Sequence, residues 1–256
     1  MDYKFIKTEV KDNVGYLIIN KPPYNVLDIP TMKEMNNALD EFKNRDDLNV
    51  LVITAEGDKA FSAGVDVADH TEDKVDEMIE VFHGIFKRLY EIPYITVAGV
   101  KGACLGGGCE VAIFCDMIFS ADNLKIGQPE IQLAVFPPIA LLVLPKIIPV
   151  KRAFEIILGG QTFNAQEAYT MGLINKYCEL EKFDEEFQKF IKPFARLSRS
   201  ALKVTKEAFK KVKDIEFKEG LPVIEDIYLN KLMKLQDAHE GLNSFLEKRK
   251  PVWSHK

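Results

Sequence analysis

Two short segments carry residue types that could stabilise a developing negative charge. The first is Phe61-Ser62-Ala63-Gly64-Val65-Asp66-Val67, and the second runs from Gly102 to Glu110 with three consecutive glycines at 106–108. Glycine lets the backbone approach a ligand closely and point its N–H groups at it. Each segment is expected to follow a buried strand and precede a helix start, which adds partial positive charge. Together they predict an oxyanion site, and glycines needed only for tight turns are the alternative.

Two glutamates lie close to these segments in the sequence and could move protons. Glu110 directly follows the glycine cluster, and Glu130 lies twenty residues later in Gly-Gln-Pro-Glu at 127–130. Beside one oxyanion site, two carboxylates would form a general acid/base pair. The local sequence equally allows Glu110 as a favourable charge at a helix N-terminus and Glu130 as a solvated loop charge.

Other catalytic chemistries find less support in the residues. No G-x-S-x-G segment marks a nucleophilic serine, and the glycine run lacks the G-x-G-x-x-G spacing of a dinucleotide site. The four histidines show no paired ligand spacing, and no cysteines form a C-x-x-C pair, so we expect buried structural thiols rather than a zinc site. The four cysteines are Cys104, Cys109, Cys115 and Cys178.

Strand and helix patterns alternate in the first half of the chain. Apolar runs predict strands at 14–19, 49–54, 95–100, 117–119 and 125–127. Helical spacing predicts one helix after an N-cap at Thr31 and another over 73–90. This alternation indicates an α/β fold with parallel strands. After about residue 138 helical patterns dominate, for example over 183–191, 200–212 and 222–235.

Bulk properties place the chain among soluble globular proteins. It has 256 residues, of which 47% are hydrophobic and 29% charged, enough for one α/β core with appended helices. The net charge of −5 makes non-specific binding of nucleic acid unfavourable. No apolar stretch approaches the ~20 residues of a membrane helix, and the N-terminus shows no secretion signal. We therefore expect a cytoplasmic protein.

Three motifs in order resemble the crotonase (enoyl-CoA hydratase/isomerase) superfamily, and the resemblance extends to the ending at 245–251. The motifs are residues 61–66, the Gly-Gly-Gly-Cys-Glu run at 106–110, and Gln-Pro-Glu at 128–130. The resemblance implies a ββα-spiral core that binds acyl-CoA over residues 1–195. It also implies a C-terminal helical region over 196–256 that mediates trimer contacts, often in a dimer of trimers. Coenzyme A would enter as part of the substrate, with no separate cofactor and no metal.

The resemblance also assigns roles to single residues. The N–H groups of Ala63 and Gly107 would form the oxyanion hole, and Glu110 and Glu130 would hold a water molecule and move its proton. Two lysines are candidates for the coenzyme A phosphates, with solvated surface charge as the alternative. The implied coenzyme A site comprises Ala63, Gly64, Val65, Asp66, Lys21 and Lys250.

One segment departs from the pattern of the family. Typical hydratases carry a glycine-rich stretch soon after the second glutamate, whereas here residues 134–142 read Ala-Val-Phe-Pro-Pro-Ile-Ala-Leu-Leu. Because this region borders the acyl pocket in the family, rigid apolar residues there indicate a pocket for a ring, or else neutral repacking.

The segments at 61–70 and 136–140 resemble hydratases that add water to a conjugated cyclic dienoyl-CoA in anaerobic aromatic degradation. Three alternatives stay open. They are a straight-chain enoyl-CoA hydratase, an enoyl-CoA isomerase, and a non-catalytic protein that binds acyl-CoA.

Overall fold

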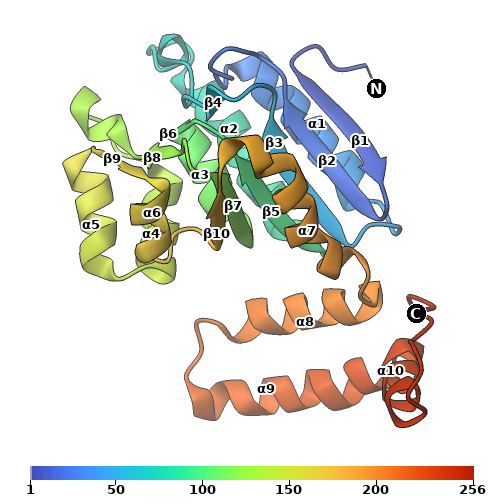
Figure 1. Ribbon diagram of the computed structural model, residues 1–256. Helices are drawn as coiled ribbons and strands as arrows, with labels where there is room; N and C mark the ends of the chain where they lie inside the picture. The colour runs from blue at the N-terminus through green and yellow to red at the C-terminus, as the bar shows by residue number, and fades with distance from the viewer. Residues whose placement is uncertain (1) are drawn as a thin grey trace.

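Two β-sheets form the centre of the molecule, and helices surround them (Figure 1). The structure is a computed structural model that describes residues 2–256. The larger sheet has six strands in the order β1-β2-β3-β5-β7-β10, and the smaller has four in the order β4-β6-β8-β9. The strands are β1 (Ile6–Lys11), β2 (Val14–Ile19), β3 (Val50–Ala55), β4 (Ala60–Ser62), β5 (Ile95–Val100), β6 (Ala103–Leu105), β7 (Met117–Ala121), β8 (Lys125–Gly127), β9 (Thr162–Asn164) and β10 (Lys176–Cys178).

The helices fill the spaces between and around these sheets. Within residues 2–256, no helix is both long and apolar enough to span a bilayer. The α-helices are α1 (Ile29–Lys43), α2 (Val75–Glu91), α3 (Gly107–Phe114), α4 (Pro138–Ile147), α5 (Val150–Gly159), α6 (Ala165–Thr170), α7 (Phe183–Ala195), α8 (Arg199–Val212), α9 (Phe217–Asn230) and α10 (Gln236–Leu246). Short 3-10 helices are η1 (Val67–Asp69), η2 (Pro129–Leu133), η3 (Leu180–Lys182) and η4 (Leu232–Lys234).

One structural unit repeats along the chain. The pairs β3 and β4, β5 and β6, and β7 and β8 each place one strand in the large sheet and the next in the small sheet. A helix follows each pair, namely α2, α3 and α4. In the large sheet β5 pairs in parallel with β3 and β7. In the small sheet β6 pairs in parallel with β4 and β8. This repeated unit confirms the predicted α/β fold with a ββα-spiral core.

The central strands of the large sheet are buried on both faces, which explains why they are continuously apolar. On β3, Val50 and Val52 belong to one cluster of buried side chains together with Phe187 of α7. Their neighbours Leu51 and Ile53 belong to the main core together with side chains of α1, α2 and α3. The alternation of side chains along a strand therefore divides the core into two layers.

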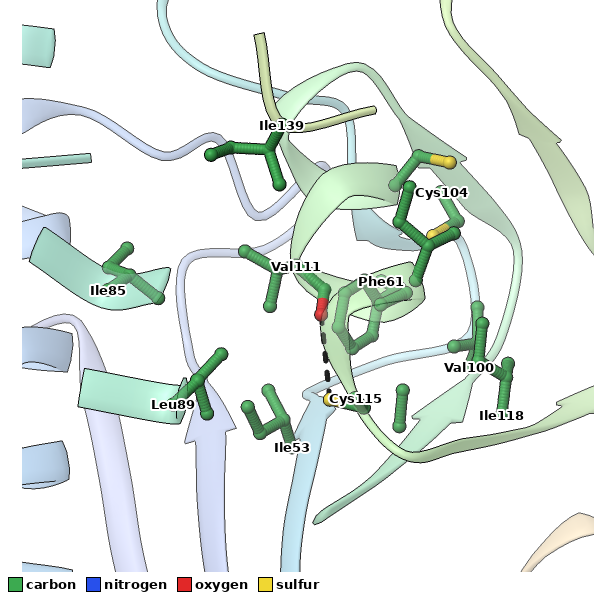
Figure 2. Close-up of a cluster of buried hydrophobic side chains, with 14 of the residues drawn as sticks. Ile53, Phe61, Ile85, Leu89, Val100, Cys104, Val111, Cys115, Ile118 and Ile139 are labelled. Carbon is green, nitrogen blue, oxygen red and sulfur yellow. Dashed lines mark hydrogen bonds between the residues drawn. The ribbon is translucent and has the colours of Figure 1, made fainter. Parts of the chain in front are cut away.

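Helix α3 is buried on nearly all sides. Figure 2 shows Val111 of α3 among Phe61 of β4, Ile85 of α2 and Ile139 of α4. Residues 107–113 of α3 are all buried, and Glu110 is the only charged residue of this helix. A carboxylate placed in such surroundings must have a specific set of partners, because burial of a lone charge is unfavourable.

The structure corrects several predicted boundaries. Helix α1 begins at Ile29, because the side chain of Asp28 accepts the N–H of Thr31 and serves as the N-cap in place of Thr31. Pro222, predicted to begin a helix, lies inside α9. The strands β1, β9 and β10 were not predicted, because polar or charged residues interrupt their apolar residues.

The helices α8, α9 and α10 lie together below the two sheets in Figure 1. Helix α7 ends at Ala195 and α8 begins at Arg199, so the predicted boundary at 195–196 falls in the connection between them. The division into two domains stays a prediction.

Asn49 links the start of β3 to this connection. Its side chain is fully buried and donates to the carbonyl oxygens of Leu197 at 2.7 Å and Ala195 at 3.3 Å. Its Oδ1 accepts from Nε of Arg199 at 3.2 Å. One amide therefore satisfies the backbone of the turn that leads into α8.

We expect Asn49→Ala to lower the free energy of unfolding by about 2 to 3 kcal/mol, because buried carbonyls lose their donor. Urea denaturation would measure this loss. Asn44→Ala is the matched control, since the Asn44 amide donates to Asp40 O on the exposed surface. That variant should change the free energy by less than about 0.5 kcal/mol. Equal losses in the two variants would contradict the role given to Asn49.

Candidate active site

The two segments singled out in the sequence meet at the ends of β4 and β6. These strands pair in parallel, with Ser62 opposite Cys104, so the residues that follow them leave the sheet side by side. A β-carbon placed on Gly64 would lie 3.1 Å from Leu105 O and 3.6 Å from Gly107 N. The segment after β4 and the start of α3 are therefore in direct contact.

Several N–H groups at this contact have no acceptor among residues 2–256, and those of Gly107 and Val65 are among them. Gly107 is the first residue of α3, so its N–H has no partner within the helix. Val65 and Leu27 form a parallel bridge whose hydrogen bonds are made by the two neighbours of Val65. Leu27 N donates to Gly64 O, and Asp66 N donates to Leu27 O. This arrangement turns the N–H of Val65 away from Leu27.

The predicted donor Ala63 is corrected. Its N–H donates to Tyr24 O at 2.9 Å and is therefore already bonded. The N–H of Gly64 is also occupied, by Ser62 Oγ at 3.1 Å. Val65, which the sequence placed only at the coenzyme A site, has an N–H with no acceptor among residues 2–256, and it lies next to Gly64 at the contact with α3. Sequence reasoning missed this donor because a backbone N–H carries no side-chain signal.

The three consecutive glycines are needed for close packing as well as for the turn. Gly106 has a φ of +52°, and a β-carbon on it would lie 2.8 Å from Glu130 Oε1. A β-carbon on Gly107 would lie 2.7 Å from Val65 Cγ2, and one on Gly108 would lie 2.6 Å from Ser62 Cβ. Only glycine allows these approaches without a shift of the neighbours.

Glu110 lies one turn into α3 and is held by the main chain of another helix. Its side chain is only 2% exposed. Its Oε1 accepts the N–H of Ile139 at 2.7 Å and that of Ala140 at 2.9 Å. Both donors belong to the first turn of α4, which begins at Pro138 within the segment 134–142 that differs from the pattern of the family.

Glu130 lies in η2 at the other side of the glycine cluster and is partly exposed. The fully buried Gln128 side chain lies beside it. With its amide oriented to donate, Gln128 reaches each oxygen of Glu130 at 3.1 Å and Gly106 O at 3.3 Å. One side chain therefore connects this carboxyl group to the oxyanion segment.

Burial raises the pKa of the Glu110 carboxyl to about 7, and the charge of Glu130 acts in the same direction. The N–H groups of Ala140 and Ile139 oppose this shift, because they stabilise the anion. Burial likewise raises the pKa of the Glu130 carboxyl to about 7. Two carboxyl groups that titrate near neutral pH can both give and take a proton.

The remaining predicted site residues lie in different surroundings. Asp66 is the N-cap of η1, where its carboxylate accepts Ala68 N. Lys21 forms an ion pair with Asp28. Lys250 follows α10, which Figure 1 shows far from α3 within the same chain.

The cysteines agree in part with the expected structural role. Cys104, Cys109 and Cys115 are buried free thiols, and Cys178 is partly exposed. Figure 2 shows the thiol of Cys115 donating to Val111 O, at 3.5 Å, in the core beneath α3.

Comparison with known proteins is consistent with this geometry. A family model described as Enoyl-CoA hydratase/isomerase matches residues 9–256. A cyclohexa-1,5-dienecarbonyl-CoA hydratase from Thauera aromatica is 33% identical over 246 residues, which cover 94% of this chain and 92% of that protein. A crotonyl-CoA hydratase from Syntrophomonas wolfei is 29% identical over 255 residues, which cover 98% of each chain.

The fold has equally close counterparts among solved structures. The crystal structure of an enoyl-CoA hydratase from Bacillus anthracis matches with a TM-score of 0.94 and 26% identity, over 99% of this chain and 100% of that one. The family match covers nearly the whole sequence, and the motifs that suggested it come together in one site. The chain therefore belongs to the enoyl-CoA hydratase/isomerase family, the crotonase superfamily.

Proposed function

We propose that the chain is an acyl-CoA hydratase that converts cyclohexa-1,5-diene-1-carbonyl-CoA to 6-hydroxycyclohex-1-ene-1-carbonyl-CoA. One observation carries the hydratase assignment. The free N–H groups of Val65 and Gly107 lie beside two carboxyl groups with raised pKa, those of Glu110 and Glu130. The ring-shaped substrate is supported by the rigid segment at 134–142 and by the similarity to the Thauera aromatica hydratase.

The thioester oxygen would sit between the N–H groups of Val65 and Gly107. Attack of water on the conjugated ring places negative charge on this oxygen, and both donors become stronger partners as the charge grows. The N-terminus of α3 adds partial positive charge at the same position. A donor of this kind typically contributes on the order of 3 kcal/mol to lowering the barrier.

The carboxyl groups would carry the two proton transfers. The oxygen of water forms a bond to a ring carbon, and a carboxylate takes one of its protons. The electrons of the diene move onto the thioester oxygen, and a carboxylic acid then returns a proton to a ring carbon. The N–H bonds to Glu110 favour its anion, so we assign proton acceptance to Glu110 and proton donation to Glu130.

Coenzyme A would enter as part of the substrate and lie along Ala63 to Asp66, with no separate cofactor. Ala63 is exposed at the edge of the site, as a contact to a ligand requires. Lys21 forms an ion pair with Asp28, so its ammonium group would have to interact with Asp28 and with a phosphate at the same time. Lys250 would serve the site of another copy in a homo-oligomer, because it follows α10, which lies far from α3 in the same chain (Figure 1). The trimeric assembly and the cytoplasmic location stay predictions.

A straight-chain enoyl-CoA hydratase is the second candidate. It would use the same donors and carboxyl groups, and the similarity to the Syntrophomonas wolfei crotonyl-CoA hydratase favours it. Rates with crotonyl-CoA and with the cyclic dienoyl-CoA would separate the two. Mass spectrometry of the products formed in heavy-oxygen water would identify hydration. Products without heavy oxygen would indicate an isomerase, and no product from either thioester would contradict a hydratase.

We expect Glu110→Gln and Glu130→Gln each to lower turnover roughly a hundredfold or more, because neither amide can accept or donate the proton. Binding of the thioester should persist, and calorimetry with a non-reacting acyl-CoA would measure it. Glu155→Gln, at an exposed carboxylate paired with Arg152 on α5, is the matched control and should retain turnover. Unchanged turnover in both site variants would remove the acid/base assignment.

The raised pKa values also predict how stability depends on pH. Each folded carboxyl has a pKa of about 7 against an ordinary value of 4.5, so the folded state binds protons more tightly than the unfolded state. Stability should therefore be highest below the unfolded pKa and fall as pH rises through the folded pKa. The melting temperature should decrease between about pH 5 and about pH 8, and less so in the Glu110→Gln, Glu130→Gln double variant. An identical decrease in both proteins would contradict the shifts.

A further inference from the structure

The first turn of α4 has an unusual distribution of hydrogen-bond donors. A helix start leaves its first N–H groups without partners in the helix. Here Pro138, at the first position, has no N–H, and Leu141 N donates to Pro137 O at 3.1 Å. Only Ile139 and Ala140 have N–H groups available, and both donate to the same oxygen of Glu110. Both available N–H groups at the start of α4 therefore bond to the Glu110 carboxyl group.

This arrangement makes the two oxygens of Glu110 different. Oε1 accepts two N–H bonds, whereas Oε2 accepts none from residues 2–256. Bonds from N–H groups to a carboxylate are stronger than those between neutral groups, and the α4 N-terminus adds to their effect. A water molecule would therefore meet Oε2, since Oε1 is already saturated.

The start of α4 and Glu110 are both held rigidly where they meet. Ala140 is fully buried and Ile139 is 8% exposed, with its side chain packed into the main core (Figure 2). Pro137 and Pro138 restrict the backbone that leads into the helix. Glu110 itself projects from the buried helix α3. The direction of its free oxygen is consequently set by packing of the core.

We propose that the main-chain N–H groups of Ile139 and Ala140 are positioning groups, which fix Oε2 of Glu110 as the oxygen that takes the proton from water. The proton-transfer part of this inference rests on the proposed function. It goes beyond that function by assigning a task to the proline-initiated helix start, and by joining the wall of the acyl pocket to the reacting carboxyl group.

The contact can be tested without any thioester. In Glu110→Ala the two N–H groups lose their acceptor, and in Glu110→Gln the amide oxygen can still accept them. We expect hydrogen exchange in the peptide covering 138–142 to become about tenfold faster or more in Glu110→Ala, and to change less than about threefold in Glu110→Gln. Glu130→Ala is the matched control and should leave this peptide unchanged. Equal exchange in both Glu110 variants would overturn the proposal.

The effect on proton transfer can be tested with Ala140→Pro, which removes one donor in the first turn of α4, where no hydrogen bond within the helix is lost. We expect the pH of half-maximal kcat on the acidic side to rise by about one unit, with kcat at neutral pH reduced about tenfold and KM nearly unchanged. Lys151→Pro is the matched control, because Lys151 lies in the first turn of α5 and its N–H has no acceptor in the described chain.

The outcomes separate the two proposals. A folded Ala140→Pro variant with the wild-type pH profile would overturn the positioning role. If that variant does not fold, the exchange comparison between the Glu110 variants decides. A wild-type protein that hydrates no thioester would refute the proposed function, while the exchange result would still report whether α4 holds Glu110.

Discussion

The site depends on the N–H groups of Val65 and Gly107, which have no acceptor among residues 2–256. A buried N–H without an acceptor costs free energy, so the fold must prevent nearby carbonyls from approaching Val65 and Gly107. The structure achieves this in two ways. The bridge to Leu27 uses the neighbours of Val65 and turns its own N–H outward, and Gly107 begins a helix. The glycines bring both donors together, because any side chain at 106–108 would separate the segments.

The carboxyl groups of Glu110 and Glu130 are both withdrawn from water and held in a fixed orientation. Each is removed from water far enough to titrate near neutral pH, yet each keeps a fixed direction. Glu110 is directed by main-chain donors from a neighbouring helix. Glu130 has the amide of Gln128, a side chain that also reaches the carbonyl of Gly106. Through Gln128, hydrogen bonds therefore join the Glu130 carboxyl to the oxyanion segment, whereas the Glu110 carboxyl is joined to the start of α4.

The features that could be predicted from the sequence are those that depend on the type of side chain. The apolar runs identified the central strands, and the glycine cluster with its following Glu110 identified the site. Boundaries failed where a local contact decides them, as at Asp28, whose carboxylate caps α1 ahead of the predicted Thr31. The oxyanion donor in the first segment was misplaced by two residues, since only the bonding of Ala63 to Tyr24 O shows which N–H is free. Similarly, nothing local in the sequence links Ile139 to Glu110, which is 29 residues away.

Reliance on the backbone has a consequence for how such a protein can diversify. An N–H group is present whatever side chain its residue carries, with proline the one exception. A substitution at position 65, 139 or 140 therefore keeps the N–H group that the site uses. Point substitutions at these positions could accommodate new acyl groups without removing any main-chain donor of the site.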